Sequence, residues 1–198
     1  MMFCSYYNNN YFRIIILIIK SMKKVTFVLF FALLAAGASA QPFERGTNMV
    51  NVGIGLGSNL GGLGDGRPAI SASYERGVWD IGGPGVISLG GYVGNTGYKY
   101  SYMNYTQKWD YTIVGVRGAY HYNGFSDVPQ LDLYGGVMLS YNIVSYSATN
   151  YSGPNSYGSG TGFSGFIGGR WMFVEKFGAF AELGYGISTL NIGLSIKF

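Results

Sequence analysis

The stretch "GYGISTLNIGLSIKF" (residues 184–198) ends in nine residues that alternate without interruption between apolar side chains and polar or small ones. The apolar parity holds Leu190, Ile192, Leu194, Ile196 and Phe198. Because successive side chains of a β-strand point to opposite faces, this period of two predicts a strand with an apolar medium on one face and polar groups on the other. The pattern alone does not say which face points inward.

The first 40 residues differ in composition from the rest of the chain. Met22-Lys23-Lys24, an apolar run at 25–37 and Ala38-Ser39-Ala40 follow the order of a secretory signal peptide. We therefore expect a cleavable helical signal peptide at 22–40, Sec-type export and cleavage between Ala40 and Gln41. Residues 1–21 contain only a short apolar run, far below the ~20 residues that span a bilayer, and are expected to be an extension from an early start codon.

The charge balance of residues 41–198 is neutral. Four of the 13 Lys and Arg residues precede residue 41, which leaves nine against nine Asp and Glu. The basic pI is therefore no argument for a nucleic-acid partner, and we expect none. The only cysteine, Cys4, also lies in the N-terminal segment, so the 158 remaining residues form one domain without a disulfide. Charged residues are 11% of the chain, where about 25% is usual for a soluble domain.

Eight alternating stretches follow residue 40, separated by clusters of turn-forming residues. Their approximate spans are 48–57, 68–78, 86–95, 109–123, 130–146, 162–173, 178–187 and 190–198. Each is near or above the ~9–11 residues with which a tilted strand crosses a bilayer. Short turns at 79–85, 124–129 and 174–177 alternate with longer connections at 58–67, 96–108 and 147–161. This asymmetry is typical of outer-membrane barrels.

Two closed eight-stranded architectures fit this pattern: a soluble lipocalin-like barrel with the apolar face inward, and a transmembrane barrel with that face outward. In the soluble barrel the lumen would have to hold nearly all the bulky apolar side chains, and eight strands do not enclose that volume. The prediction is therefore an all-β, eight-stranded antiparallel up-and-down transmembrane β-barrel over 41–198. We expect it in the outer membrane, in contact with lipid and lipopolysaccharide.

With the apolar face outward, the inward positions carry three acids and three bases. These residues are Glu75, Asp132 and Glu182, and Arg117, Arg170 and Lys197. Buried charges are tolerated when they are paired, so the equal numbers predict a neutral network of charges in a filled lumen.

Aromatic residues cluster where the two membrane interfaces are expected. Those near the short turns are Trp79, Tyr122, Phe125, Trp171, Phe173 and Phe198, and those near the long connections are Tyr98, Trp109, Tyr141, Phe163 and Tyr185. The sequence thus predicts an aromatic belt at each interface.

The stretch "GGRWMFVEKFGAFAELGYGISTLNIGLSIKF" (168–198) resembles the closing strands of the small outer-membrane β-barrel proteins of Gram-negative bacteria, the OmpA-type and OmpX-type barrels. The resemblance in pattern covers roughly 41–198. It implies that Phe198, a terminal aromatic residue after an alternating strand, is part of the signal read by the outer-membrane assembly machinery. No peptidoglycan-binding domain follows the barrel pattern, so the wall-tethering role of OmpA-type proteins is not expected.

The sequence contains no motif typical of nucleotide binding, catalysis or metal binding. The glycine-rich stretch 53–66 lacks G-x-G-x-x-G and no helical pattern follows it, so it is not a nucleotide-binding loop. His121 is the only histidine; it lies at the turn end, where we interpret it as a hydrogen-bonded lumen residue. There is neither G-x-S-x-G nor a cluster of metal ligands. We expect no cofactor, no metal and no enzymatic activity.

The long connections are rich in tyrosine. "YKYSYMNYTQKW" (98–109) and "SATNYSGPNSYGSG" (147–160) combine Tyr with Ser, Asn and Gly, a composition common in binding surfaces. The candidate contact residues are Tyr98, Tyr100, Tyr102, Tyr105, Tyr151 and Tyr157. The sequence therefore favours a structural or surface-interaction role, such as adhesion or contact with an unknown extracellular ligand. The alternatives are a narrow pore for small solutes and, less favoured, a surface enzyme.

Overall fold

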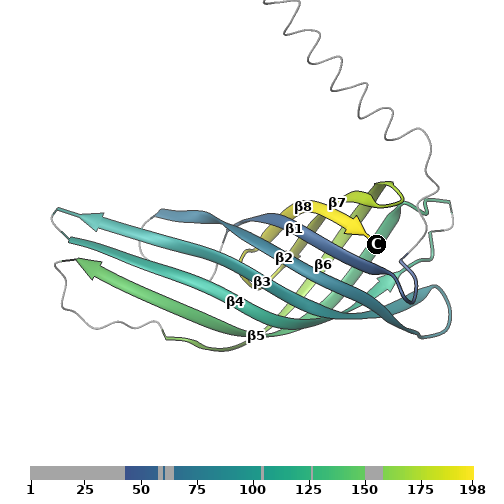
Figure 1. The fold of residues 1–198 in the computed structure, drawn as a ribbon, viewed down its shortest axis with the longest axis horizontal. Coiled ribbons are helices and arrows are strands. Elements are labelled where there is room, and N and C mark those ends of the chain that lie inside the picture. The colour runs from purple at the N-terminus through teal and green to yellow at the C-terminus, as the bar shows by residue number, and fades with distance from the viewer. Residues whose placement is uncertain (1–42, 58–59, 61–64, 104, 126, 150–157) are drawn as a thin grey trace, which may run out of the picture. The chain divides into compact units, whose positions relative to one another are not determined.

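The computed structural model describes residues 43–57, 60, 65–103, 105–125, 127–149 and 158–198. Within them, eight antiparallel strands lie in space in their sequence order, and the last pairs with the first to close a barrel (Figure 1). The strands are β1 (Asn48–Leu56), β2 (Asp65–Asp80), β3 (Gly85–Tyr102), β4 (Tyr105–Tyr122), β5 (Leu131–Thr149), β6 (Gly160–Val174), β7 (Phe177–Gly184) and β8 (Leu190–Lys197). The predicted all-β, eight-stranded up-and-down barrel is confirmed. The expected extension and signal peptide lie outside the described residues, among which no helix has the length and apolarity to cross a membrane.

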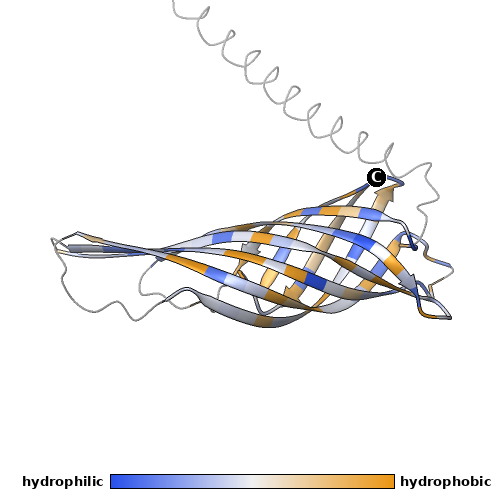
Figure 2. Cartoon of the chain, turned by 60° about the horizontal axis from the view of Figure 1, so that its bottom comes forward, coloured by the Kyte–Doolittle hydropathy of each residue, from blue (hydrophilic) through white to orange (hydrophobic). Residues whose placement is uncertain are grey.

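Hydrophobic and hydrophilic residues alternate along the strands (Figure 2), and the burial of their side chains shows which residues face inward. In β8, Ser195 is fully buried, whereas Leu194 is 62% exposed. In β1, Asn51 is buried, and Val52 and Ile54 are 50% and 55% exposed. The apolar parity is therefore the outer face of the barrel, and the polar parity faces the lumen.

Large side chains fill the space between the lumen glycines. Tyr92, Tyr134, Met138, Phe166 and Phe180 all point inward and are buried. Tyr134 packs edge-on against Phe166, with their ring centroids 6.4 Å apart. The interior of the described barrel is thus a packed core, as expected for only eight strands.

The predicted loop over 96–108 is wrong, because β3 and β4 continue through it. They pair from Gly97↔Asp110 to Tyr102↔Tyr105, so only two residues, 103 and 104, separate them. Tyr and Thr favour extended backbone, and Met103 has a φ of 49°, in the left-handed region that a tight hairpin requires. Strand β5 continues alongside as far as Thr149. Strands β3, β4 and β5 therefore extend beyond their neighbours at one end of the barrel (Figure 1), and we call this part the extended sheet.

The prediction of the loop-side aromatic belt is wrong for two residues. Trp109 is only 4% exposed, and Tyr98 is half-buried with its ring edge-on to Tyr111 at 6.0 Å. Both residues belong to the continued strands β3 and β4. Their side chains point to the inner face because side chains alternate between the two faces of a strand. The other loop-side members, Phe163, Tyr185 and Tyr141, are exposed on the outer face, as are Trp79 and Trp171 at the opposite end.

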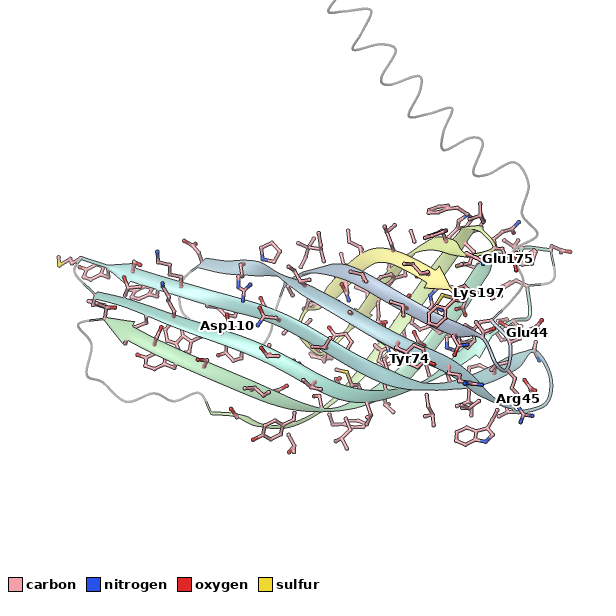
Figure 3. The ribbon with its side chains drawn as sticks, in the orientation of Figure 1. Glu44, Arg45, Tyr74, Asp110, Glu175 and Lys197 are labelled. Carbon is pink, nitrogen blue, oxygen red and sulfur yellow. The ribbon has the colours of Figure 1, made fainter. Side chains whose placement is uncertain are left out.

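The opposite end of the barrel carries short turns and an N-terminal segment that folds back over it. In the turn 81–84, Gly82 and Gly83 have φ of 74° and 78°, which residues with a side chain rarely adopt. Residues 43–47 dock on β2: Gly46 N–H donates to the Gly77 carbonyl at 2.8 Å, and Gly77 N–H donates to the Thr47 carbonyl at 3.0 Å. A Cβ at position 77 would overlap the Glu44 carbonyl oxygen, so this close approach requires glycine. Figure 3 shows Glu44, Arg45, Glu175 and Lys197 at this end, which we call the turn end, and Asp110 towards the other.

Candidate functional site

Four charged side chains form a closed ring in the lumen near the turn end. Arg170 donates through Nη1 to Asp132 Oδ2 at 2.6 Å and through Nη2 to Glu75 Oε1 at 2.8 Å. His121 contacts the same two carboxylates, with Nδ1 2.9 Å from Asp132 Oδ1 and Nε2 3.2 Å from Glu75 Oε2. Arg170, His121 and Glu75 are each 0% exposed. We refer to Glu75, His121, Asp132 and Arg170 as the charged ring.

The charged ring is built by strands from different parts of the wall. Asp132 and Arg170 are direct cross-strand partners on β5 and β6. His121 comes from β4, and Glu75 reaches the ring from β2. A carboxylate only accepts hydrogen bonds. Both His121 nitrogens face carboxylate oxygens, so a protonated imidazole donates to both carboxylates. In that form two cations balance two anions, and the ring is neutral.

A second ion pair lies deeper in the lumen. Arg117 Nη2 is 2.7 Å from Glu182 Oε2, and Tyr134 OH donates to the same oxygen at 3.3 Å. The Arg117 guanidinium carbon lies 3.8 Å from the centre of the Phe166 ring, a cation–π contact. Tyr134 also lies under Arg170, with 4.7 Å between the guanidinium carbon and the ring centre, so it connects this pair to the charged ring.

A water-sized cavity of about 20 Å³ adjoins this pair. Four polar atoms that line it have no hydrogen-bond partner among the described residues: Arg117 Nε, Ser164 Oγ, Ser188 Oγ and Asn191 Oδ1. A cavity of this size holds one water with two to four polar partners. The site is therefore suited to one buried water and is too small for a solute.

The lumen assembles five of the six residues that the sequence analysis assigned to the charge network. Lys197, the sixth, is half-buried at the turn end, opposite Met49 of β1, and is not part of the charged ring. His121 was not predicted to belong to the network, although it faces the same side of β4 as Arg117. Phe43, which covers the charged ring, was also missed, because it precedes the first strand and no periodic pattern includes it.

His121 contacts a serine and an aspartate, the two partners that a histidine has in a hydrolytic triad. Ser88 Oγ lies 2.9 Å from His121 Nε2, and His121 Nδ1 lies 2.9 Å from Asp132. However, Glu75 Oε2 is also 3.2 Å from Nε2 and accepts a hydrogen bond from Ser88 at 3.1 Å, so this second carboxylate competes for both partners of the Ser88–His121 contact. Ser88 is 1% exposed and could not meet a substrate. This arrangement is suited to holding the wall together, not to acyl transfer.

The candidate tyrosines occupy the extended sheet. Tyr102 is 52% exposed at the tip, with its ring centroid 5.8 Å from that of Tyr105. Tyr100 also contacts Tyr105, at 6.1 Å, whereas Tyr98 packs inward on Tyr111. Tyr151 and Tyr157 lie outside the described residues. In the part of the chain that the structure describes, no group of three His, Cys, Asp or Glu side chains is placed to hold a metal ion.

Phe198 lies just beyond β8, where its N–H donates to the Asn48 carbonyl at 3.1 Å. Its ring is 65% exposed on the outside of the barrel, 6.4 Å from that of Tyr74. The terminal aromatic is therefore accessible beside the seam between β1 and β8.

No protein-family model matches the chain, and no curated protein matches its sequence. Among solved structures, the chain is similar to the attachment invasion locus protein Ail of Yersinia pestis, both alone (TM-score 0.47) and in complex with the heparin analogue sucrose octasulfate (TM-score 0.48). In both cases the sequence identity is 13%, and the match covers 77% of this chain and 95% of that one. It is also similar to the N-terminal β-barrel domain of Pseudomonas aeruginosa OprF, with a TM-score of 0.43, 16% identity and coverage of 78% and 98%.

Proposed function

We propose that the chain is an integral outer-membrane β-barrel whose extended sheet makes contacts at the cell surface. The observation that carries the membrane placement is a belt of exposed apolar side chains on all eight strands. One member from each strand is Ile54, Ile70, Val93, Val116, Leu139, Ile167, Leu183 and Leu194. A belt of this extent is unfavourable in water, where exposed apolar patches rarely exceed a few hundred Å².

The positions of the charges support the same placement. The charged residues that the structure describes lie either in the lumen or towards the two ends of the barrel. Arg76 is exposed on β2 near the turn end, and Asp110 is exposed in the extended sheet. Mid-membrane Arg or Lys on the lipid face would cost about 2–4 kcal/mol. The short turns and both ends of the described chain are then periplasmic, and the extended sheet faces outward.

Cell fractionation with heat-modifiable gel mobility tests the placement. A folded membrane barrel migrates differently before and after boiling, and the protein should sediment with the outer membrane. Recovery in the soluble periplasmic fraction, with the same mobility before and after boiling, would contradict the proposal.

The surface-contact role rests on the tyrosines of the extended sheet. Tyr100, Tyr102 and Tyr105 combine rigid aromatic area with hydroxyl groups and lie at the tip of the hairpin farthest from the turn end. The test compares the binding of intact cells to a panel of immobilised proteins and glycans, for the parent protein and for the double variant Tyr102→Ser/Tyr105→Ser. Tyr122→Ser, at the opposite end, is the matched control. Binding that is equal for all three proteins, or absent for the parent, would contradict the role.

A pore is the second candidate, and the packed lumen argues against it. The charged ring, Phe43 and the Arg117–Phe166 contact occupy the axis, and the cavity beside them holds about 20 Å³. We therefore expect no steady conductance from purified protein in planar bilayers. The triad-like arrangement at His121 is sealed from solvent, which does not support a catalytic role for it.

A further inference from the structure

The outer face of the extended sheet places two lysines directly opposite each other. Lys99 of β3 and Lys108 of β4 are cross-strand partners, and both are exposed. Side chains in such a pair start about 5 Å apart, and like charges at this position are destabilising. Neither lysine forms an ion pair with another described residue, although Asp65 is the β2 partner of Lys99.

The neighbouring row of the sheet is already neutralised. Arg67 of β2 reaches across β3 at Gly97 to Asp110 of β4, with Nη2 2.7 Å from Oδ2. A Cβ at position 97 would lie 2.9 Å from Arg67 Nε, so the absence of a side chain there opens the path. Asp110 is thus engaged by Arg67 and also accepts from Asn95 Nδ2 at 2.7 Å. The two lysines and Asp65 leave this face with one uncompensated positive charge.

A surface depression of about 290 Å³ lies over these residues. Its charged lining consists of three basic residues, Arg67, Lys99 and Lys108, and two acidic ones, Asp65 and Asp110; Ser145 and Ser147 of β5 add hydroxyl groups. Ammonium groups and serine hydroxyls are hydrogen-bond donors of the kind that bind phosphate oxygens. Because Arg67 already neutralises Asp110, the lining keeps one net positive charge at the two lysines, where an anion with several oxygens would be favoured.

The position of the depression relative to the apolar belt indicates the source of that anion. Ser147, the cross-strand partner of Lys108, lies four residues beyond Ile143, an exposed residue of the apolar belt. Four residues at about 3.3 Å, tilted by about 45°, place the lysines about 9 Å above the belt. Lysine side chains can also bend back towards the interface. This is the level of the headgroups in the outer leaflet, given the membrane placement proposed above.

We propose that Lys99 and Lys108 bind a phosphate group of an outer-leaflet glycolipid. The phosphate separates the two ammonium groups and converts an unfavourable pair into two favourable contacts. The inference rests on the proposed function, because only an outer-membrane barrel presents this face to such a lipid.

The proposal requires that the two lysines lower thermal stability in the absence of a lipid phosphate and raise it in its presence, and the test compares these two conditions. In zwitterionic micelles, Lys99→Gln should unfold at the same temperature as the parent protein or a higher one, because it removes the like-charge pair. In bilayers containing lipid A with two phosphates, the parent should gain thermal stability over bilayers of dephosphorylated lipid A. The double variant Lys99→Gln/Lys108→Gln should lose most of that gain, at about 2–4 °C per lysine. Lys176→Gln, an exposed lysine at the turn end, should keep it.

Three results would overturn the proposal. These are a double variant that retains the full gain, a Lys176→Gln variant that loses as much, and an equal gain when inorganic phosphate is added to the micelles. Failure of the membrane placement is distinguishable, because the parent protein would then be recovered in the soluble fraction of cells. A membrane-integrated parent with an unaffected double variant would contradict the lysine site alone.

Discussion

The ring of Phe43 lies flat on the imidazole of His121, with the ring centroids 3.8 Å apart and the planes 11° apart. The same ring is 5.9 Å from the Arg170 guanidinium carbon, and Asn123 Nδ2 donates to the Phe43 carbonyl at 2.6 Å. Phe43 is 2% exposed. The N-terminal segment therefore covers the charged ring on the turn side and excludes water from it.

Phe43→Ala should lower the free energy of unfolding by about 3 kcal/mol, the low end for truncating a buried phenylalanine. The loss includes the packing against His121 and the entry of water to the charged ring. Urea unfolding in lipid vesicles measures it. Phe125→Ala is the control, since Phe125 is 39% exposed at the same end of the barrel, and an equal loss for both variants would contradict the role of Phe43.

Arg170→Leu should destabilise the barrel by about 3–5 kcal/mol, because it leaves Glu75 and Asp132 in the lumen with only His121 between them. Adding Glu75→Gln to Arg170→Leu should recover part of the loss, which is the signature of coupled residues. The free energies of unfolding of the single and double variants give the comparison. Additive losses would show that the two side chains act independently.

Gly90→Ala and Gly91→Ala should differ sharply although the residues are adjacent. A Cβ at position 90, on the lumen side of β3, would overlap the Tyr74 carbonyl oxygen, whereas at position 91 the nearest atom would lie 3.8 Å away. We expect Gly90→Ala to cost about 1–3 kcal/mol through displaced backbone and Gly91→Ala to have little effect. Equal midpoints of urea unfolding would refute this difference.

Phe198→Ala should separate assembly in cells from stability in the test tube. Its ring is 65% exposed, so the purified variant should refold into detergent with nearly the stability of the parent. If the assembly machinery reads this residue, the amount of folded barrel in the outer membrane should fall severalfold. Normal levels in the membrane would rule out Phe198 as part of the assembly signal.

The number and order of the strands followed from the sequence because the alternation reports burial directly. Leu194 and Ser195 differ in exposure as their parity requires, and so do Val116 and Arg117. The tyrosine-rich stretch at 98–109 was misread because Ser, Asn, Lys and Tyr are common in loops, yet its alternation continues through Tyr100 and Tyr102. In the extended sheet, pairing with β5 stabilises strands whose composition alone is ambiguous.

The alternation of side chains along each strand could not predict which lumen residues contact one another. Parity places Glu75, His121 and Arg170 in the interior, but their contacts depend on the relative stagger of strands that are not neighbours. The salt bridge between Glu75 and Arg170 spans 95 residues of chain. The contact of Phe43 depends on the path of an irregular segment, which no periodicity describes.

The seam between β1 and β8 has a consequence for biogenesis. Ser195 Oγ donates to Asn51 Oδ1 across 144 residues, so the cylinder cannot close before β8 is available to pair with β1. Until then, the strands expose unpaired backbone groups and an apolar face to water, a combination that promotes aggregation. A chain cut short before β8 would form no smaller version of the same cylinder, and its survival would depend on a holding chaperone.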